Sequence, residues 1–204
     1  MLDPLPKFGD RRRIRIGLLG GSFNPAHAGH RHIALLALRR LRLDQVWLLV
    51  SPGNPLKPTD GMAPLTQRIA GARRIADGRR VIATAIEAAW GTRFTIDTLR
   101  KLRRRFPRAR FVWLMGADIL TQLPHWLHWR DLLRLAPIAV LPRPGYTRRA
   151  LTGQAARWLR HARRSKHAAC LLPGTAPGWV LLMAPQVAIS ATAIRAGVVQ
   201  GALP

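Results

Sequence analysis

Six short apolar runs alternate with helical patterns along most of this chain, and this alternation restricts the possible fold more than any other feature. The runs have strand length and lie at 14–19, 46–51, 81–85, 111–115, 138–141 and 180–183. Apolar residues recur at helical spacing between most of them, at about 29–43, 65–77, 95–106 and 126–136. Strands that are apolar throughout and alternate with helices form parallel sheets covered on both faces. The sequence therefore predicts an α/β, Rossmann-like fold.

The chain length is sufficient for one α/β domain with a substantial core. It has 204 residues, of which 48% are hydrophobic, as in globular proteins. We expect 1–204 to form a single domain in which 1–12 are flexible. Region 142–178 contains proline and glycine breaks around a helical spacing of apolar residues, so we interpret it as a basic surface helix and connector.

The same sequence indicates a location in the cytoplasm. One cysteine, Cys170, excludes an internal disulfide framework and fits a reducing compartment. The first residues are charged and lack the apolar core of a signal peptide. No apolar run approaches the roughly 20 residues that a membrane helix needs. We therefore expect a cytoplasmic protein with no membrane partner.

The charge of the chain is strongly positive. There are 34 Lys and Arg residues against nine Asp and Glu residues, a formal net charge of +25. Such a field attracts polyanions, including nucleotides and nucleic acids. The basic residues are mostly arginine and are scattered along the chain, and Glu87 is the only glutamate, which points to biased composition as much as to a selected surface. We expect incidental, salt-sensitive binding to nucleic acid and no specific nucleic-acid partner.

The first apolar run and the first helical pattern are joined by the segment GGSFNPAHAGH, residues 20–30. A glycine turn between a strand and a helix gathers backbone amides and a helix N-terminus, which together attract phosphate. His27 and His30 are three residues apart in the first helical turn and can face the same ligand. In the alternative, His27 caps the helix and His30 packs. We expect the amide cradle to consist of Gly20, Gly21, Ser22 and Phe23.

This segment resembles the GG-[ST]-F-[DN]-P-x-H-x-G-H signature of nucleotidyltransferases that share a Rossmann-like domain with class I aminoacyl-tRNA synthetases. Within that group the chain is most similar to bacterial nicotinate-nucleotide adenylyltransferases. The resemblance implies transfer of the adenylyl group of ATP to nicotinate mononucleotide, giving deamido-NAD and pyrophosphate. It implies binding of ATP by the amide cradle and by His30, and contact of Ser22 with the mononucleotide as well.

A second phosphate site is expected near the end of the chain. Residues 189–195, ISATAIR, place two hydroxyls and a guanidinium at the start of a short helix. They resemble the family's I-S-S-T-x-[IL]-R motif, which implies contact with the β- and γ-phosphates of ATP. The residues that carry this expectation are Ile189, Ser190, Thr192 and Arg195. Ala191 stands where the family has a second serine, so one hydroxyl contact is missing from the pattern.

Further segments resemble the parts of the family that bind the two substrates. Residues 51–57, SPGNPLK, resemble its P-P-H-K segment, with Leu56 at the histidine position, and imply that Asn54 and Lys57 contact the mononucleotide; a solvated loop lysine is the alternative. Residues 94–99, FTIDTL, resemble its Y-T-x-D-T-L helix start and imply that Thr95 binds the pyridine carboxylate.

The strand at 111–115 leads into a segment that resembles the family's G-x-D motif. The likeness implies that Gly116 and Asp118 contact the adenosine and that Trp126 stacks on the nicotinate ring. Because Trp126 and Trp129 are three residues apart, both could instead form a core-facing helical stripe; we assign Trp129 to the core and Trp126 to the ligand. His32, His125 and His128 are expected to be structural or surface residues.

Adenylyl transfer needs an in-line phosphate oxygen and positive charge at the leaving pyrophosphate, without a covalent nucleophile. We expect His27, His30, Lys57 and Arg195 to be catalytic, the imidazoles becoming charged donors beside phosphate. Magnesium is expected with ATP, held by nucleotide and water, because no carboxylate cluster is visible in the sequence.

The sequence leaves alternatives open. Nicotinamide mononucleotide and phosphopantetheine are alternative acceptors of the adenylyl group. The alternative from another class is a basic nucleic-acid-binding protein on an inactive fold. A homo-oligomer is compatible with the sequence.

Overall fold

The described residues form a sheet of six parallel strands. The structure is a computed structural model that describes residues 4–6, 8–53, 61–183, 191–195 and 197. The strands lie side by side in the order β3-β2-β1-β4-β5-β6. Each coincides with a predicted strand to within one or two residues at its ends: β1 (Arg15–Gly21), β2 (Gln45–Val50), β3 (Val81–Thr84), β4 (Arg110–Gly116), β5 (Ile138–Leu141) and β6 (Trp179–Leu181).

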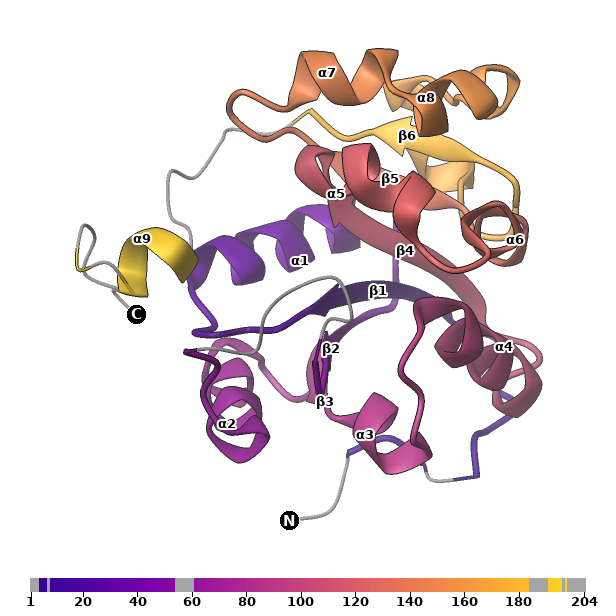
Figure 1. Cartoon of the computed structure of the whole chain (residues 1–204). Helices are drawn as coiled ribbons and strands as arrows, with labels where there is room; N and C mark the ends of the chain where they lie inside the picture. Colours follow the sequence, from indigo (N-terminus) through magenta and orange to yellow (C-terminus); the bar gives the residue numbers. More distant parts are fainter. Residues whose placement is uncertain (1–3, 7, 54–60, 184–190, 196, 198–204) are drawn as a thin grey trace.

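Helices follow the strands along the chain (Figure 1). The α-helices in the described residues are α1 (Ala28–Arg40), α2 (Leu65–Ile75), α3 (Ile86–Trp90), α4 (Thr95–Arg105), α5 (Ala117–Gln122), α6 (Trp129–Leu135), α7 (Thr147–Thr152), α8 (Gln154–Trp158) and α9 (Ala191–Arg195). Short 3-10 helices are η1 (Leu123–His125), η2 (Arg160–Ala162) and η3 (Lys166–Leu171). Of the helices described, none combines the length and apolar character needed to cross a bilayer.

The helix predicted at 126–136 begins later than its apolar spacing indicated. It starts at Trp129, because His128 has a left-handed backbone with φ of 50° and Trp126 is extended with ψ of 143°. Trp126 and Trp129 are therefore not neighbours on one helical face. This difference frees Trp126 from the helix and leaves it in the loop between η1 and α6.

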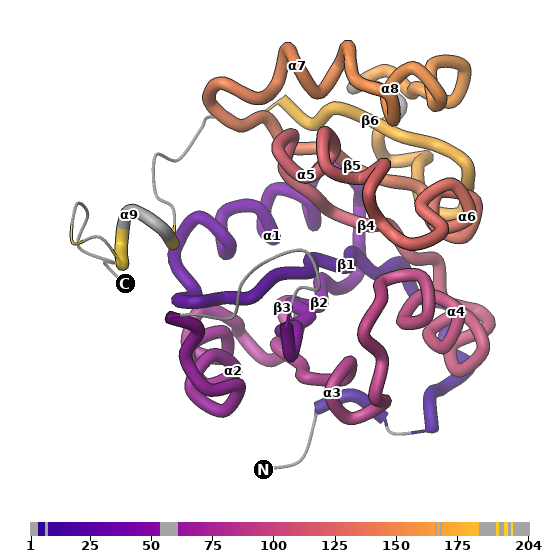
Figure 2. The backbone as a smooth tube through the Cα atoms, viewed as in Figure 1, coloured from indigo at the N-terminus to yellow at the C-terminus, as the bar shows by residue number. Residues whose placement is uncertain are grey.

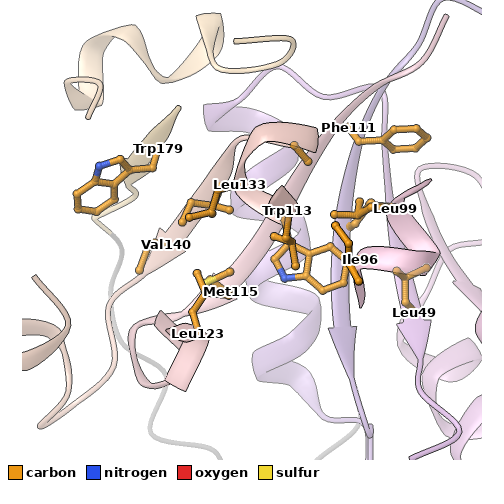
Figure 3. Packing of buried hydrophobic residues seen from close by; sticks show 14 of the residues in the cluster. Leu49, Ile96, Leu99, Phe111, Trp113, Met115, Leu123, Leu133, Val140 and Trp179 are labelled. Atoms are coloured by element: carbon orange, nitrogen blue, oxygen red, sulfur yellow. The ribbon is translucent and has the colours of Figure 1, made fainter. Parts of the chain in front are cut away.

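Helices cover both faces of the sheet, as predicted. Strand side chains alternate between two buried clusters, so that Trp113 faces one and Leu114 faces the other. Helices α1 and α2 pack on the cluster that contains Leu114. The opposite cluster is covered by α4, α5, α6 and α8, and Figure 3 shows Trp113 there beside Ile96 of α4. Leu5 also belongs to this cluster and is buried, so part of the N-terminal segment packs on the core.

Region 142–178 forms several short helices and not a single long one. Helices α7 and α8 both contact α5, and their residues Ala150, Ala155 and Ala156 are buried in the core. The arginines of this region lie mainly on the outside, as expected for a basic surface. The segment therefore extends the helical layer over the edge of the sheet next to β5 and β6 (Figure 1).

The strand order determines where a ligand can bind. Strand β1 lies between β2 and β4, so the chain crosses over the sheet in opposite directions on either side of β1. In doubly wound sheets the crevice at such a switch point, beyond the carboxyl ends of the strands, is the usual ligand site. Gly21, Val50 and Gly116 end β1, β2 and β4 at this edge. The segments singled out in the sequence follow these ends.

Candidate active site

The turn from β1 into α1 is made by residues 20–27, which we call the phosphate loop. Strand β1 ends at Gly21 and helix α1 begins at Ala28, with His27 as its N-cap. A Cβ on Gly20 would lie 2.9 Å from the ring of Trp113, so any side chain there would displace the indole. The structure thus adds a second reason for glycine at this position, besides the room that phosphate needs.

Phe23 gives the phosphate loop its shape. Its backbone is left-handed, with φ of 49°, which is uncommon for a residue with a side chain. Its ring is buried, 2% exposed, and its centroid lies 4.7 Å from that of His30. A left-handed backbone costs on the order of 1 kcal/mol and persists only where the surroundings fix it. Burial of the ring supplies part of that constraint.

The two histidines of the signature are in contact with each other. Their ring centroids are 3.9 Å apart, and the backbone N–H of His27 donates to Nδ1 of His30 at 3.2 Å. Since Nδ1 of His30 accepts a hydrogen bond, its proton resides on Nε2 in the neutral ring. Nδ1 of His27 is buried and has no hydrogen-bond partner among the described residues. The pair therefore holds polar hydrogen-bonding capacity that the described protein does not use.

Both imidazoles are neutral at pH 7 in this structure. Burial lowers the pKa of His30 to about 3, with further lowering by the nearby His27 and Arg143. Burial and Arg143 likewise lower the pKa of His27 to about 4. The charged donor form expected from the sequence therefore requires the negative charge of a phosphate beside the rings. Without that charge, the rings act as neutral N–H donors.

Arg143 is a site residue that the motifs did not reveal. It follows β5, and its Nε lies 3.4 Å from Oδ1 of Asp118 in an ion pair. A Cβ on Gly116 would overlap Oδ1 of Asp118 and lie 3.2 Å from Nε of Arg143, so a side chain there would displace the Asp118 carboxylate. Arg143 also acts electrostatically on both histidines. Its position directly after a strand, at the edge where ligands bind, was the available signal.

The C-terminal helix lies against the phosphate loop. Nη1 of Arg195 donates to the backbone carbonyl of Asn24, across almost the whole length of the chain. Figure 1 shows α9 beside the start of α1, and in Figure 2 the yellow end of the chain meets the indigo segment. The two segments predicted to hold phosphate are therefore neighbours. Ile189, Ser190, Asn54 and Lys57 lie outside the described residues, as does the side chain of Thr192.

Trp126, one of the two residues predicted to hold the pyridine ring, lies beside Trp113. The rings of Trp113 and Trp126 meet edge to face with centroids 6.4 Å apart, and Trp113 also contacts Gly20. Thr95 is the first residue of α4 and is half-buried. Trp129 instead packs against Trp158, with ring centroids 5.7 Å apart, and like Trp126 it is only partly buried against the core. His125 and His128 are exposed, as expected.

A buried carboxyl holds the segment that leads to Thr95. Oγ1 of Thr98 lies 3.0 Å from Oε1 of Glu87 and 3.0 Å from Oγ1 of Thr92. The backbone N–H of Thr92 donates to the carbonyl of Glu87 at 2.9 Å. Burial raises the pKa of Glu87 to about 7, against the opposing effect of the Thr98 hydrogen bond. This network anchors both ends of the loop before α4.

We expect Glu87→Gln to change how stability depends on pH. In the unfolded chain the Glu87 carboxyl has its ordinary pKa of 4.5, whereas in the folded protein its pKa is about 7. Between pH 4.5 and 7 the folded protein therefore holds a proton that the unfolded chain has lost. The free energy of unfolding of the wild-type protein decreases as pH rises through this range. The glutamine variant has no such proton. Between pH 4.5 and 8, the free energy of unfolding of the variant relative to wild type should increase by about 3 kcal/mol, as measured by urea unfolding. Asp131→Asn, at a half-exposed carboxylate, serves as the control; parallel wild-type and glutamine profiles would contradict the prediction.

The described residues do not form a metal-binding cluster of their own. In the part of the chain that the structure covers, no three His, Cys, Asp or Glu side chains are grouped to hold an ion. The donors gathered at the site are imidazoles, guanidinium groups and backbone amides, all of which suit an anion.

Comparison with known proteins agrees with this geometry. The model of the Cytidylyltransferase-like family matches residues 18–197. A probable nicotinate-nucleotide adenylyltransferase of Gluconobacter oxydans is 62% identical over 183 residues, which cover 89% of this chain and 94% of that protein. A protein of the same name from Gluconacetobacter diazotrophicus is 55% identical over 196 residues, covering 96% of this chain and 91% of that protein.

Solved structures show the same fold. The nicotinic acid mononucleotide adenylyltransferase of Plasmodium falciparum, complexed with NaAD, superposes with a TM-score of 0.68 at 15% identity, covering 92% of this chain and 85% of that one. Its complex with APC gives a TM-score of 0.66 over 90% of this chain and 83% of that one. From the family model and the identity to its bacterial relatives, the chain belongs to the nicotinate-nucleotide adenylyltransferases of the cytidylyltransferase-like family.

Proposed function

We propose that this protein transfers the adenylyl group of ATP to nicotinate mononucleotide, a step of NAD biosynthesis. A phosphate oxygen of the mononucleotide attacks the α-phosphorus of ATP. The bond from that phosphorus to the oxygen bridging to the β-phosphate breaks, and pyrophosphate leaves with the electron pair. Deamido-NAD is the second product. The observation that supports this proposal most directly is the contact of Arg195 with Asn24, because it joins both phosphate-binding segments in one site.

The residues around the phosphate loop would act by electrostatic stabilisation. Nε2 of His30 has its proton available, since Nδ1 is held by the backbone of His27. Arg195 and Arg143 bring guanidinium groups to the same edge of the sheet. Negative charge grows on the transferring phosphoryl group and on pyrophosphate, so fixed donors there lower the barrier without a covalent step. Lys57 stays a prediction in this role.

Magnesium would enter with ATP as part of the substrate. Mg²⁺ keeps several waters and binds readily to phosphate oxygens, so it needs few protein ligands. The cationic and amide donors of the described site fit a nucleotide whose charge the ion partly neutralises. They do not fit a resident ion held by the protein alone.

The acceptor would lie on the side of the loop where Trp126 and Thr95 are found. The indole of Trp126 is half-buried beside Trp113. An aromatic face suits an electron-poor pyridine ring. Asn54 and Lys57 stay predicted contacts of the same substrate. A cytoplasmic location, a homo-oligomer and the lack of a specific nucleic-acid partner also stay predictions.

The test is to identify the product. The purified protein is incubated with magnesium and either ATP or CTP, together with nicotinate mononucleotide, nicotinamide mononucleotide or phosphopantetheine. Pyrophosphate release is followed and the product is identified by mass spectrometry. We expect deamido-NAD from ATP and nicotinate mononucleotide at the highest rate. Faster reaction with another acceptor would correct the substrate. No release with any pair, together with tight and steeply salt-dependent nucleic-acid binding, would favour the inactive-fold alternative.

A further inference from the structure

Arg68 is a buried cation that the sequence motifs do not include. It lies in the first turns of α2, its exposed fraction is 4%, and burial lowers its pKa. An arginine side chain keeps its charge in proteins, so a guanidinium is buried here. In the described part of the chain its hydrogen-bond partners are backbone carbonyls, and no carboxylate is paired with it. Burying such a group is costly unless its donors are well used.

The donors of Arg68 join three separate segments. Nη1 donates to the carbonyl of Ser22 at 2.8 Å and to that of Ser51 at 2.6 Å. Nη2 donates to the carbonyl of Pro52 at 3.1 Å. Nε donates to the carbonyl of Ala63 at 2.8 Å, just before α2. One guanidinium therefore links the phosphate loop, the two residues directly after β2 and the start of α2.

The bond to Ser22 determines the direction of one amide in the phosphate loop. In a trans peptide the C=O and the following N–H point in opposite directions. Because the carbonyl of Ser22 points at Arg68, the N–H of Phe23 points away from it. Phe23 also holds the strained left-handed backbone, with φ of 49°. Arg68 thus restrains the peptide next to the strained residue of the loop.

We propose that Arg68 is a positioning residue for adenylyl transfer, holding the phosphate loop and the residues directly after β2, Ser51 and Pro52, in the relative placement that the in-line geometry requires. This inference rests on the proposed function. It assigns Arg68 no contact with substrate. A misplacement of about 1 Å can lower turnover by about 10²-fold while ground-state binding changes little. The effect of Arg68 should therefore appear mainly in kcat.

The experiment compares Arg68→Lys and Arg68→Ala with wild type and with Arg74→Lys, a control at an exposed arginine of the same helix. Steady-state kinetics with ATP and nicotinate mononucleotide give kcat and both KM values, normalised to the folded fraction from circular dichroism. Lysine keeps the charge but lacks the fork, so it distinguishes positioning from a simple field effect. We expect Arg68→Lys to lose about 10²-fold in kcat with small changes in KM, and Arg74→Lys to match wild type.

Adding guanidinium ion to the Arg68→Ala variant distinguishes loss of the side chain's hydrogen bonds from general destabilisation, because only the former can be restored by the added ion. Millimolar guanidinium should partly restore kcat in Arg68→Ala, whereas sodium chloride at equal ionic strength should not. Wild-type-like kcat in Arg68→Lys, a loss that merely follows the folded fraction, or no rescue of the alanine variant would each overturn the inference. A wild-type protein that does not react with nicotinate mononucleotide would instead overturn the proposed function, so the two failures are distinguishable.

Discussion

Replacing His30 by alanine should lower kcat by about 10²- to 10³-fold, with a much smaller effect on the binding of ATP. The imidazole is held by His27 through Nδ1 and by ring contacts with His27 and Phe23, so its remaining N–H is fixed in place before substrate arrives. A donor fixed in this way stabilises the charge that develops in the transition state and contributes less to the ground state. Steady-state kinetics and equilibrium titration with ATP measure the two effects separately.

His32→Ala is the matched control for this variant. His32 lies on the same helix, two residues further along, and the sequence predicted no catalytic role for it. We expect its kcat to stay near the wild-type value. An ordinary turnover in His30→Ala, or an equal loss in His32→Ala, would contradict the role given to His30.

Arg195→Ala should lower kcat/KM for ATP by about 10²-fold. Arg195 stands on α9 and reaches the carbonyl of Asn24, so its removal takes one cation away from the site and disconnects the C-terminal segment from the phosphate loop. Lysine at this position restores the charge without the planar fork and should recover only part of the loss. Kinetics with ATP varied at saturating mononucleotide give the comparison.

Arg40→Ala removes an exposed arginine at the end of α1 and controls for the loss of one positive charge. Because the protein carries a formal charge of +25, a single distant arginine should have little effect on ATP kinetics. Equal losses of kcat/KM for ATP in Arg195→Ala and Arg40→Ala would show that this value depends on overall charge and not on the position of Arg195.

The strands and the phosphate loop could be predicted because their signals are local. A fully buried parallel strand is apolar throughout, and the turn from β1 into α1 is encoded in one continuous segment. The first residue of α6 could not be predicted from such local signals. The apolar spacing continues through Trp126, but the left-handed backbone of His128 delays the helix until Trp129, and spacing alone does not report backbone conformation.

The residues that the sequence did not reveal act over long distances along the chain. Arg68 bonds Ser22 from 46 positions away, and Arg143 meets Asp118 only after β4 and β5 have paired. Among so many arginines, the motifs do not distinguish these two from surface residues, although Arg143 stands shortly after a predicted strand, at the edge where ligands bind. The neutral state of His27 and His30 is also a consequence of burial, which the motif does not contain. Protonation and positioning therefore required the folded structure.

A crystal structure of the protein with magnesium, a non-hydrolysable ATP analogue and nicotinate mononucleotide would show directly whether both ends of the chain bind one triphosphate. We expect one triphosphate held from both ends of the chain, with Nε2 of His30 and the guanidinium of Arg195 each within hydrogen-bonding distance of its oxygens. A triphosphate that binds away from the phosphate loop, or that contacts only one of these two segments, would contradict this expectation.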